Sequence, residues 1–399
     1  MKRIVSRELI TVVIILGLGT LARGILEPIL PLYLTSIGIV PTILGLMFSV
    51  AMVGMIIGEG SSGWIADKVG LKIPMSTGTF ICALVVFCFV LTQKIPAIFL
   101  IFFFWGIARS ALLPVGRGYI GATVPLLKKA TFMAIFTAIL IASRSLGTLM
   151  SGFVVDTWGY HQSFFISCGI ALLGGIVVVT GLRKIRLIKP KSPAVLSSPT
   201  DELPSPERVY SYRPIALQCA VAALHFLGMG IIYVFLPLLA TQVVGVAATE
   251  VGILFTIGGL ATVVLLIPLG RLADRKGKRT LMIVGLLVSA FALAGVAFTE
   301  SFPWLIVFII IRSLGIAMFS PAAVALLSDA VPLERQSTAM GLYGVCENIG
   351  IIAGSALGGF VWSAWGPQPT FLIGTIAASL GAAICFGLTR DKVSKNPCY

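Results

Sequence analysis

The feature that most constrains this chain is a series of apolar segments, each about 20 residues long, which recurs from Leu9 to Leu388. A helix of that length crosses a hydrocarbon core of about 30 Å. Only 11% of the residues are charged, whereas a soluble domain carries about 25%. This composition excludes a water-soluble enzyme, a secreted disulfide scaffold and a nucleic-acid-binding protein. It predicts an all-α polytopic membrane protein.

We predict twelve transmembrane helices, with bounds at 8–35, 42–66, 73–92, 96–122, 130–155, 161–182, 214–240, 249–272, 280–298, 303–328, 336–362 and 368–389. The net charge of +14 comes from basic residues that fall almost entirely in alternate loops, and the other loops contain only Lys94 among Lys and Arg. Because loops rich in Lys and Arg stay in the cytoplasm, we expect both termini on that side of the plasma membrane. The absence of an Asn-x-Ser/Thr sequon favours a prokaryotic inner membrane.

The chain repeats itself at an offset of 207 residues, which indicates two similar halves. The clearest matches pair Gly63, Asp67, Lys68, Gly70 and Lys72 with Gly270, Asp274, Arg275, Gly277 and Arg279. A polar segment rich in Pro and Ser separates the halves. We therefore predict two pseudo-symmetric six-helix bundles, over residues 1–183 and 213–399, joined by a cytoplasmic linker over residues 184–212.

Six spans per half give both halves the same orientation in the membrane. Two such halves that rock about a site near the bilayer midplane form the alternating-access design of secondary transporters. The sequence contains no nucleotide-binding loop, metal cluster or hydrolase motif. We therefore expect a transporter rather than an enzyme, with no cofactor or metal and with an ion gradient as its energy source.

Residues 63–72 read GWIADKVGLK and resemble the loop 2–3 signature of the major facilitator superfamily, G-x-x-x-D-[RK]-x-G-[RK]-[RK], with one departure at Leu71. Residues 270–279 match the signature fully. The resemblance covers nearly the whole chain and implies the fold of that superfamily and a gating role for both copies. In physical terms, we expect Asp67 to contact the positive end of the span-11 dipole, and Asp274 that of span 5, when the cytoplasmic side is closed.

Drug/proton antiporters of this superfamily carry a span-5 signature, G-x8-G-x3-G-P-x2-G-G. Span 5 here has a degraded copy, Ala134, Ser143, Gly147, Thr148, Ser151 and Gly152. Span 11 has a copy that lacks only the proline, Gly341, Gly350, Gly354, Ser355, Gly358 and Gly359. The resemblance implies an exporter that exchanges a drug for protons, and the alternative interpretation of these small residues is close helix packing.

Ionisable residues inside the membrane cost roughly 2.5–3.5 kcal/mol each near a helix centre, so each requires an explanation. Most lie in the first half, which predicts a central cavity with one charged wall and one apolar wall. Such a cavity suits an amphiphile. The predicted cavity residues are Arg23, Glu27, Arg109, Arg144, Glu347, Asn348, Tyr33 and Tyr233.

Glu27 is the leading candidate for proton coupling. Pro28 and Pro31 follow it and free backbone groups next to the carboxyl. Burial favours the neutral carboxyl and nearby arginines favour the charged one, so these opposing effects can poise a cavity carboxyl to exchange a proton. The alternative is a static ion pair with Arg23, one helical turn earlier.

Arg109 and Glu347 complete the predicted proton-coupling set. Arg109 occupies the span-4 position where the superfamily often has an arginine linked to proton transfer, and its permanent charge would support an acidic partner or bind an anionic head. Glu347 is a second candidate, and its alternative role is as a buried partner of Arg312 or Asn348. Arg144 matches Ile351 in the repeat, so its charge is not a scaffold feature shared by both halves.

The sequence therefore predicts a monomer, embedded in membrane lipid, that exports an amphiphilic small molecule against protons. Uptake or facilitated passage of an organic anion is an alternative, as are a lipid flippase and a receptor or assembly factor on the same fold. The anion alternative rests on an excess of arginines over glutamates within the spans. These are Arg23, Arg109, Arg117, Arg144 and Arg312 against Glu27, Glu59 and Glu347.

Overall fold

The computed structural model describes residues 7–70, 72–110, 126–181, 213–331 and 336–393. In these residues the first half of the chain forms helices α1 (Arg7–Ser36), α2 (Pro41–Val69), α3 (Lys72–Leu91), α4 (Ile95–Ser110), α6 (Leu126–Trp158) and α7 (Tyr160–Gly181). The second half forms α8 (Arg213–Gln242), α9 (Ala248–Lys276), α10 (Lys278–Ala297), α11 (Phe302–Asp329), α12 (Gln336–Trp365) and α13 (Pro367–Val393).

The helices agree with the predicted spans to within about one helical turn, except for α4. Eleven helices of the described chain are long and apolar enough to cross a membrane. The helix α4 is described only to Ser110, and the rest of the span predicted at 96–122, with Arg117, lies outside the described residues. The prediction of an all-α membrane protein is confirmed. The count of twelve spans and the division into two six-helix bundles stay predictions.

The positions of the backbone turns repeat at the offset of 207 residues. Glycines with a positive φ form three pairs at this offset, Gly38 with Gly245, Gly70 with Gly277 and Gly159 with Gly366. Gly70 separates α2 from α3 with a φ of 89°, and Gly277 separates α9 from α10 with a φ of 96°. Residues with a Cβ rarely adopt this conformation, so the turn itself requires the second glycine of the gating motif.

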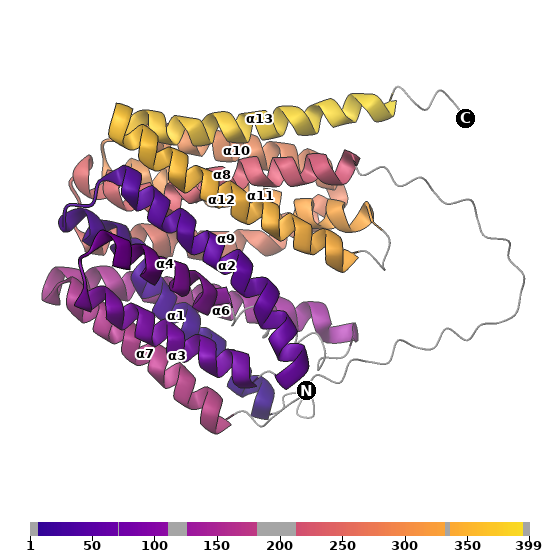
Figure 1. The fold of residues 1–399 in the computed structure, drawn as a ribbon. Helices are drawn as coiled ribbons and strands as arrows, with labels where there is room; N and C mark the ends of the chain where they lie inside the picture. Colours follow the sequence, from indigo (N-terminus) through magenta and orange to yellow (C-terminus); the bar gives the residue numbers. More distant parts are fainter. Residues whose placement is uncertain (1–6, 71, 111–125, 182–212, 332–335, 394–399) are drawn as a thin grey trace, which may run out of the picture.

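The two halves lie side by side and meet along three helix pairs, α2 with α12, α6 with α9 and α1 with α8. Arg7 and Val393, the first and last described residues, lie at the same side of the molecule, which we call the terminal side (Figure 1). The connections 37–40, 159 and 243–247 lie at the opposite side, which we call the far side.

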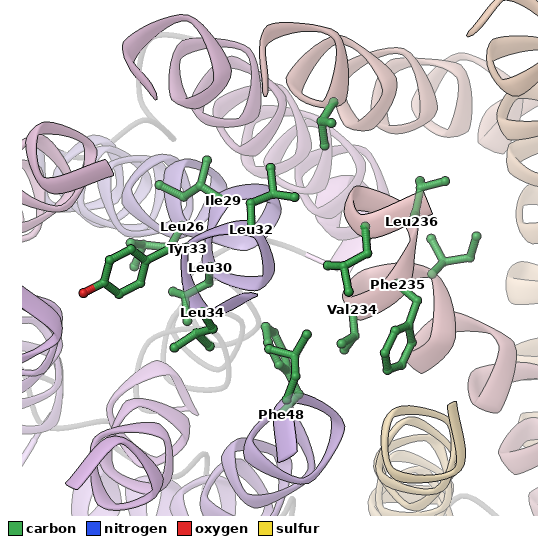
Figure 2. Packing of buried hydrophobic residues seen from close by; sticks show 14 of the residues in the cluster. Leu26, Ile29, Leu30, Leu32, Tyr33, Leu34, Phe48, Val234, Phe235 and Leu236 are labelled. Carbon is green, nitrogen blue, oxygen red and sulfur yellow. The ribbon is translucent and has the colours of Figure 1, made fainter. Parts of the chain in front are cut away.

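A buried apolar cluster joins the halves toward the far side. Figure 2 shows Leu30 and Leu34 of α1, Phe48 of α2, and Val234 and Phe235 of α8 within it. Because α1 and α8 both run from the terminal side to the far side, this cluster fills the space between the far-side parts of the halves. The central cavities lie next to this cluster.

Small residues allow the halves to approach closely on the far side. A Cβ on Gly152 of α6 would overlap the backbone of α9, and a Cβ on Gly359 of α12 would overlap that of α2. The Ser49 hydroxyl of α2 donates to a carbonyl of α12 at 3.0 Å, and the Thr256 hydroxyl of α9 donates to a carbonyl of α6 at 2.9 Å. Both pairs, 152 with 359 and 49 with 256, obey the repeat offset. The signature glycines Gly152 and Gly359, together with Ser49 and Thr256, therefore pack helices of opposite halves together.

Candidate functional site

Two adjoining cavities lie between the halves. One has a volume of about 100 Å³ and is lined by α1, α2, α4, α8 and α12. The other has a volume of about 150 Å³ and is lined by α6, α8, α9 and α11. Met229 and Tyr233 of α8 line both cavities and form the wall that they share. The charged lining residues are Arg23, Glu27 and Arg109 in the first cavity and Arg144 and Arg312 in the second.

The Glu27 carboxylate is the centre of a three-residue ionic network. Its Oε1 accepts a hydrogen bond from Arg23 Nε at 2.5 Å, and its Oε2 accepts one from Arg144 Nε at 2.6 Å. The Glu27 side chain is only 9% exposed, so its charge needs this compensation. Since Arg23 lies on α1 and Arg144 on α6, the carboxylate links two helices. The pair with Arg23, which the sequence offered as the alternative to proton coupling, is present, and Arg144 is an additional partner.

Two glycines allow Arg144 to reach Glu27. A Cβ on Gly24 of α1 would overlap the backbone carbonyl of Arg144, and a Cβ on Gly147 of α6 would overlap the carbonyl oxygen of Leu21. The backbones of α1 and α6 are therefore nearly in contact one turn before Glu27. Because of this close approach, the Arg144 side chain needs to extend only a short distance to reach the Glu27 carboxylate. The guanidinium carbon of Arg144 also lies 5.3 Å from the Tyr233 ring centroid.

Two further arginines of the cavities form no ion pair within the described part of the chain. Arg109 Nη2 donates to Met55 Sδ at 3.6 Å, and its guanidinium carbon lies 4.5 Å from the Trp105 ring centroid. Arg312 is 7% exposed, and its Nη2 donates to Met229 Sδ at 2.9 Å. The Nε atoms of both arginines are buried and have no hydrogen-bond partner among the described residues. The cavities therefore hold an excess of positive charge.

The remaining predicted cavity residues lie in different places. Tyr233 lines both cavities. Tyr33 is buried within the first half, where its ring packs edge-on against Phe164 and its hydroxyl donates to a carbonyl of α3. Asn348 is buried in α12 and donates to the Gly344 carbonyl at 3.0 Å. Glu347, half-buried on the same helix, lines neither of the two cavities.

The gating motif is described in part. The surroundings of Gly63 and the side chains of Asp67 and Asp274 are not described, so the predicted contacts of the two aspartates stay predictions. Lys72 Nζ donates to the Val179 carbonyl at 2.6 Å and thereby joins α3 to α7. Lys68, Arg275 and Gly277 are exposed, and Gly270 and Arg279 are partly exposed.

Arg312 was not assigned to the cavity from the sequence, where it was counted among the arginines within the spans and offered as a buried partner for Glu347. The structure describes no ion pair between them, and Arg312 instead lies beside Met229. The thioethers of Met55 and Met229 were also missed, since methionine in an apolar helix carries no signal that separates it from packing residues. No group of three or more His, Cys, Asp or Glu in the described residues is placed to hold a metal.

Comparison with known proteins identifies the class of this fold. The sequence profile of the Major Facilitator Superfamily matches residues 12–215 and 218–397. The chain therefore belongs to the major facilitator superfamily, and it is a multi-pass membrane transporter rather than an enzyme.

Two relatives and one solved structure illustrate the proteins to which this chain is similar. An uncharacterised MFS-type transporter of Methanocaldococcus jannaschii is 22% identical over 346 residues, 86% of this chain and 87% of that one. The multidrug resistance protein MdtG of Enterobacter lignolyticus is 23% identical over 379 residues, 92% of this chain and 88% of that one. A structure of the nucleoside transporter NupG superposes with a TM-score of 0.77 at 15% identity, over 96% of this chain and 99% of that one, and shows the shared fold.

The contact between α1 and α6 leads to a first prediction. We expect Gly24→Ala to destabilise the protein by about 1–3 kcal/mol, because the added methyl group forces the α6 backbone away. Gly169→Ala on α7 is the matched control, since a Cβ there would meet nothing within 4 Å. Thermal unfolding in lipid nanodiscs should show a lower midpoint for Gly24→Ala only. Equal midpoints for the two variants would contradict the close approach of α1 and α6.

Proposed function

We propose that this protein is a proton-coupled secondary transporter that exports an amphiphilic small molecule by alternating access. The observation that carries the proposal is the buried Glu27 carboxylate, which faces a cavity between the halves and is held there by Arg23 and Arg144. Similarity to MdtG, whose name denotes multidrug resistance, supports export as the direction.

A change in the protonation of Glu27 would alter both the charge and the contacts of the cavity. The charged carboxylate accepts one hydrogen bond from each arginine, whereas the neutral acid loses both ion pairs. Protonation therefore weakens the link between α1 and α6 and adds one positive charge to the cavity. A substrate whose cationic or hydrogen-bond-donating group needs the charged carboxylate would bind only after the proton leaves. Competition of this kind produces exchange.

The rest of the cavity offers a surface for the apolar part of an amphiphile. Ile232 and Leu236 of α8, Phe255 of α9 and Ile309 of α11 line the second cavity beside its two arginines. One ligand can therefore contact charged groups of α1 and α6 and the mostly apolar lining of the second half, in which Arg312 is the charged residue. This division supports an amphiphilic substrate rather than a uniformly polar one.

The proposal includes the organisation predicted from the sequence. Residues 1–183 and 213–399 form two six-helix bundles of one monomer, joined by the 184–212 linker, with the terminal side in the cytoplasm of a prokaryotic cell. The contacts between the halves that hold the far side together support a resting state open toward the cytoplasm. In the state that is closed on the cytoplasmic side, Asp67 stabilises the closed contact through the helix dipole of α12, and Asp274 does so through that of α6.

Proton release from acid-loaded proteoliposomes tests the role of Glu27. We expect an amphiphilic substrate, added outside, to trigger release in wild type, and Glu27→Gln to abolish it because the amide cannot exchange a proton. Glu300→Gln makes the same chemical change in an exposed loop and should retain the flux. An internal pH-sensitive dye reports the proton movement. Wild-type flux in Glu27→Gln would show that Glu27 has only a structural role.

Transport of an organic anion is a second candidate, favoured by the excess charge of the cavities. Four arginines and one carboxylate line them, and neither Arg109 nor Arg312 has a carboxylate partner within the described residues. An anion that binds Arg144 would displace Glu27, which would then take up a proton. The anion and the proton would therefore move in the same direction, so the sign of the proton flux distinguishes the two candidates.

The Arg312 guanidinium provides the test of this second candidate. We expect Arg312→Gln to reduce anion-driven proton uptake at least roughly ten-fold, because loss of a charged hydrogen-bond donor to a buried anion costs more than about 1.5 kcal/mol. Lys94→Gln removes the same charge from an exposed far-side loop and should leave the uptake unchanged. Proton release with cationic amphiphiles, together with no anion-driven uptake in wild type, would exclude the anion candidate.

A further inference from the structure

The far-side ends of the helices carry contacts between the halves that the cavity does not use. Asp156, near the end of α6, places its carboxylate on the first turn of α9. Oδ1 accepts a hydrogen bond from the Ala248 N–H at 3.2 Å, and Oδ2 accepts one from the Thr249 N–H at 2.7 Å and one from the Thr249 hydroxyl at 2.5 Å. The residue at the N-cap of α9, Ala247, provides no side-chain cap. A helix of the second half is therefore capped by a side chain of the first half.

The repeat supplies the reciprocal contact. Ser363 of α12 lies 207 residues after Asp156, and Thr42 of α2 lies 207 residues before Thr249. The Ser363 hydroxyl oxygen accepts hydrogen bonds from the Thr42 N–H at 3.1 Å and from the Thr42 hydroxyl at 2.9 Å. Here a helix of the first half is capped by a side chain of the second half. The two caps are related by the pseudo-symmetry of the molecule.

We propose that these two reciprocal caps form the far-side gate, which holds the far side closed and breaks each time the halves rock apart. The first N–H groups of a helix have no partner within the helix, and the N-terminus carries a partial positive charge. A cap supplied by the other half satisfies these groups only in the closed state. When the far side opens, water replaces the cap at these exposed positions, so the contact can be made and broken repeatedly.

The two caps differ in strength. Asp156 brings a negative charge to the positive end of α9, whereas Ser363 brings a neutral hydroxyl to that of α2. Charge-assisted hydrogen bonds and the helix dipole both favour the carboxylate. The contact between α6 and α9 is therefore the stronger half of the gate. The inference rests on the alternating access of the proposed function, but this asymmetry requires neither a particular substrate nor proton coupling.

Energy transfer between two dyes measures the gate directly. The dyes are attached at positions 93 and 300, exposed far-side sites in the first and second half, in an otherwise cysteine-free full-length chain in lipid nanodiscs. We expect Asp156→Ala to raise the ratio of far-side-open to closed molecules by roughly two- to thirty-fold, as expected for the loss of an N-cap. Ser363→Ala should have a smaller effect. Asp156→Ser, which copies the other half, should restore part of the closed population.

Two further variants make the test decisive. Ser363→Asp introduces the stronger cap at α2 and should increase the closed population above that of wild type. Thr157→Ala is the matched control, because among the described residues the Thr157 hydroxyl bonds only to carbonyls of its own helix. A merely structural role for Asp156 would lower the unfolding temperature without changing the open-to-closed ratio. That result, or equal ratios in Asp156→Ala and Thr157→Ala, would overturn the proposal.

Discussion

A carboxylate buried among membrane helices is tolerated only when its charge is compensated, and the organisation of the central site depends on this constraint. Glu27 uses both oxygens to bind guanidinium groups of α1 and α6. Those bonds require the two backbones to approach closely, which Gly24 and Gly147 permit. The same network leaves Arg109 and Arg312 without a counter-ion in the described chain, and the cavities acquire a positive character.

The contacts between the halves depend on close packing and neutral hydrogen bonds more than on buried charges. Within a membrane, helices associate through close packing and hydrogen bonds rather than through release of water from apolar surface. The far-side interface is accordingly built from glycines, hydroxyl groups and reciprocal helix caps that occur in pairs at the 207-residue offset. The charges of the cavity do not follow this offset, since Arg144 matches Ile351. In our proposals, the symmetric contacts between the halves form the gate, and the asymmetric charges of the cavity bind the substrate.

The helices and the Arg23–Glu27 pair were predictable from the sequence because both depend on local spacing. Bilayer thickness sets the length of each apolar segment, and residues four apart on a helix are neighbours. The partner of Glu27 on α6 was not predictable, because it depends on how α1 and α6 cross. Tyr33, predicted to line the cavity, packs against Phe164 instead. In a helix that is apolar on every face, no hydrophobic pattern shows which way a side chain points.

By itself, the sequence determined that this protein is an all-α membrane transporter with an internal repeat and a small set of charges within its spans. These properties follow from composition, segment length and residue spacing, which act along the chain. Only the tertiary structure decided that Glu27 binds Arg144, that Arg312 faces the cavity, and that Asp156 and Ser363 cap helices of opposite halves. Each of these contacts joins residues at least 83 positions apart, and their meeting depends on the rotation and crossing of whole helices.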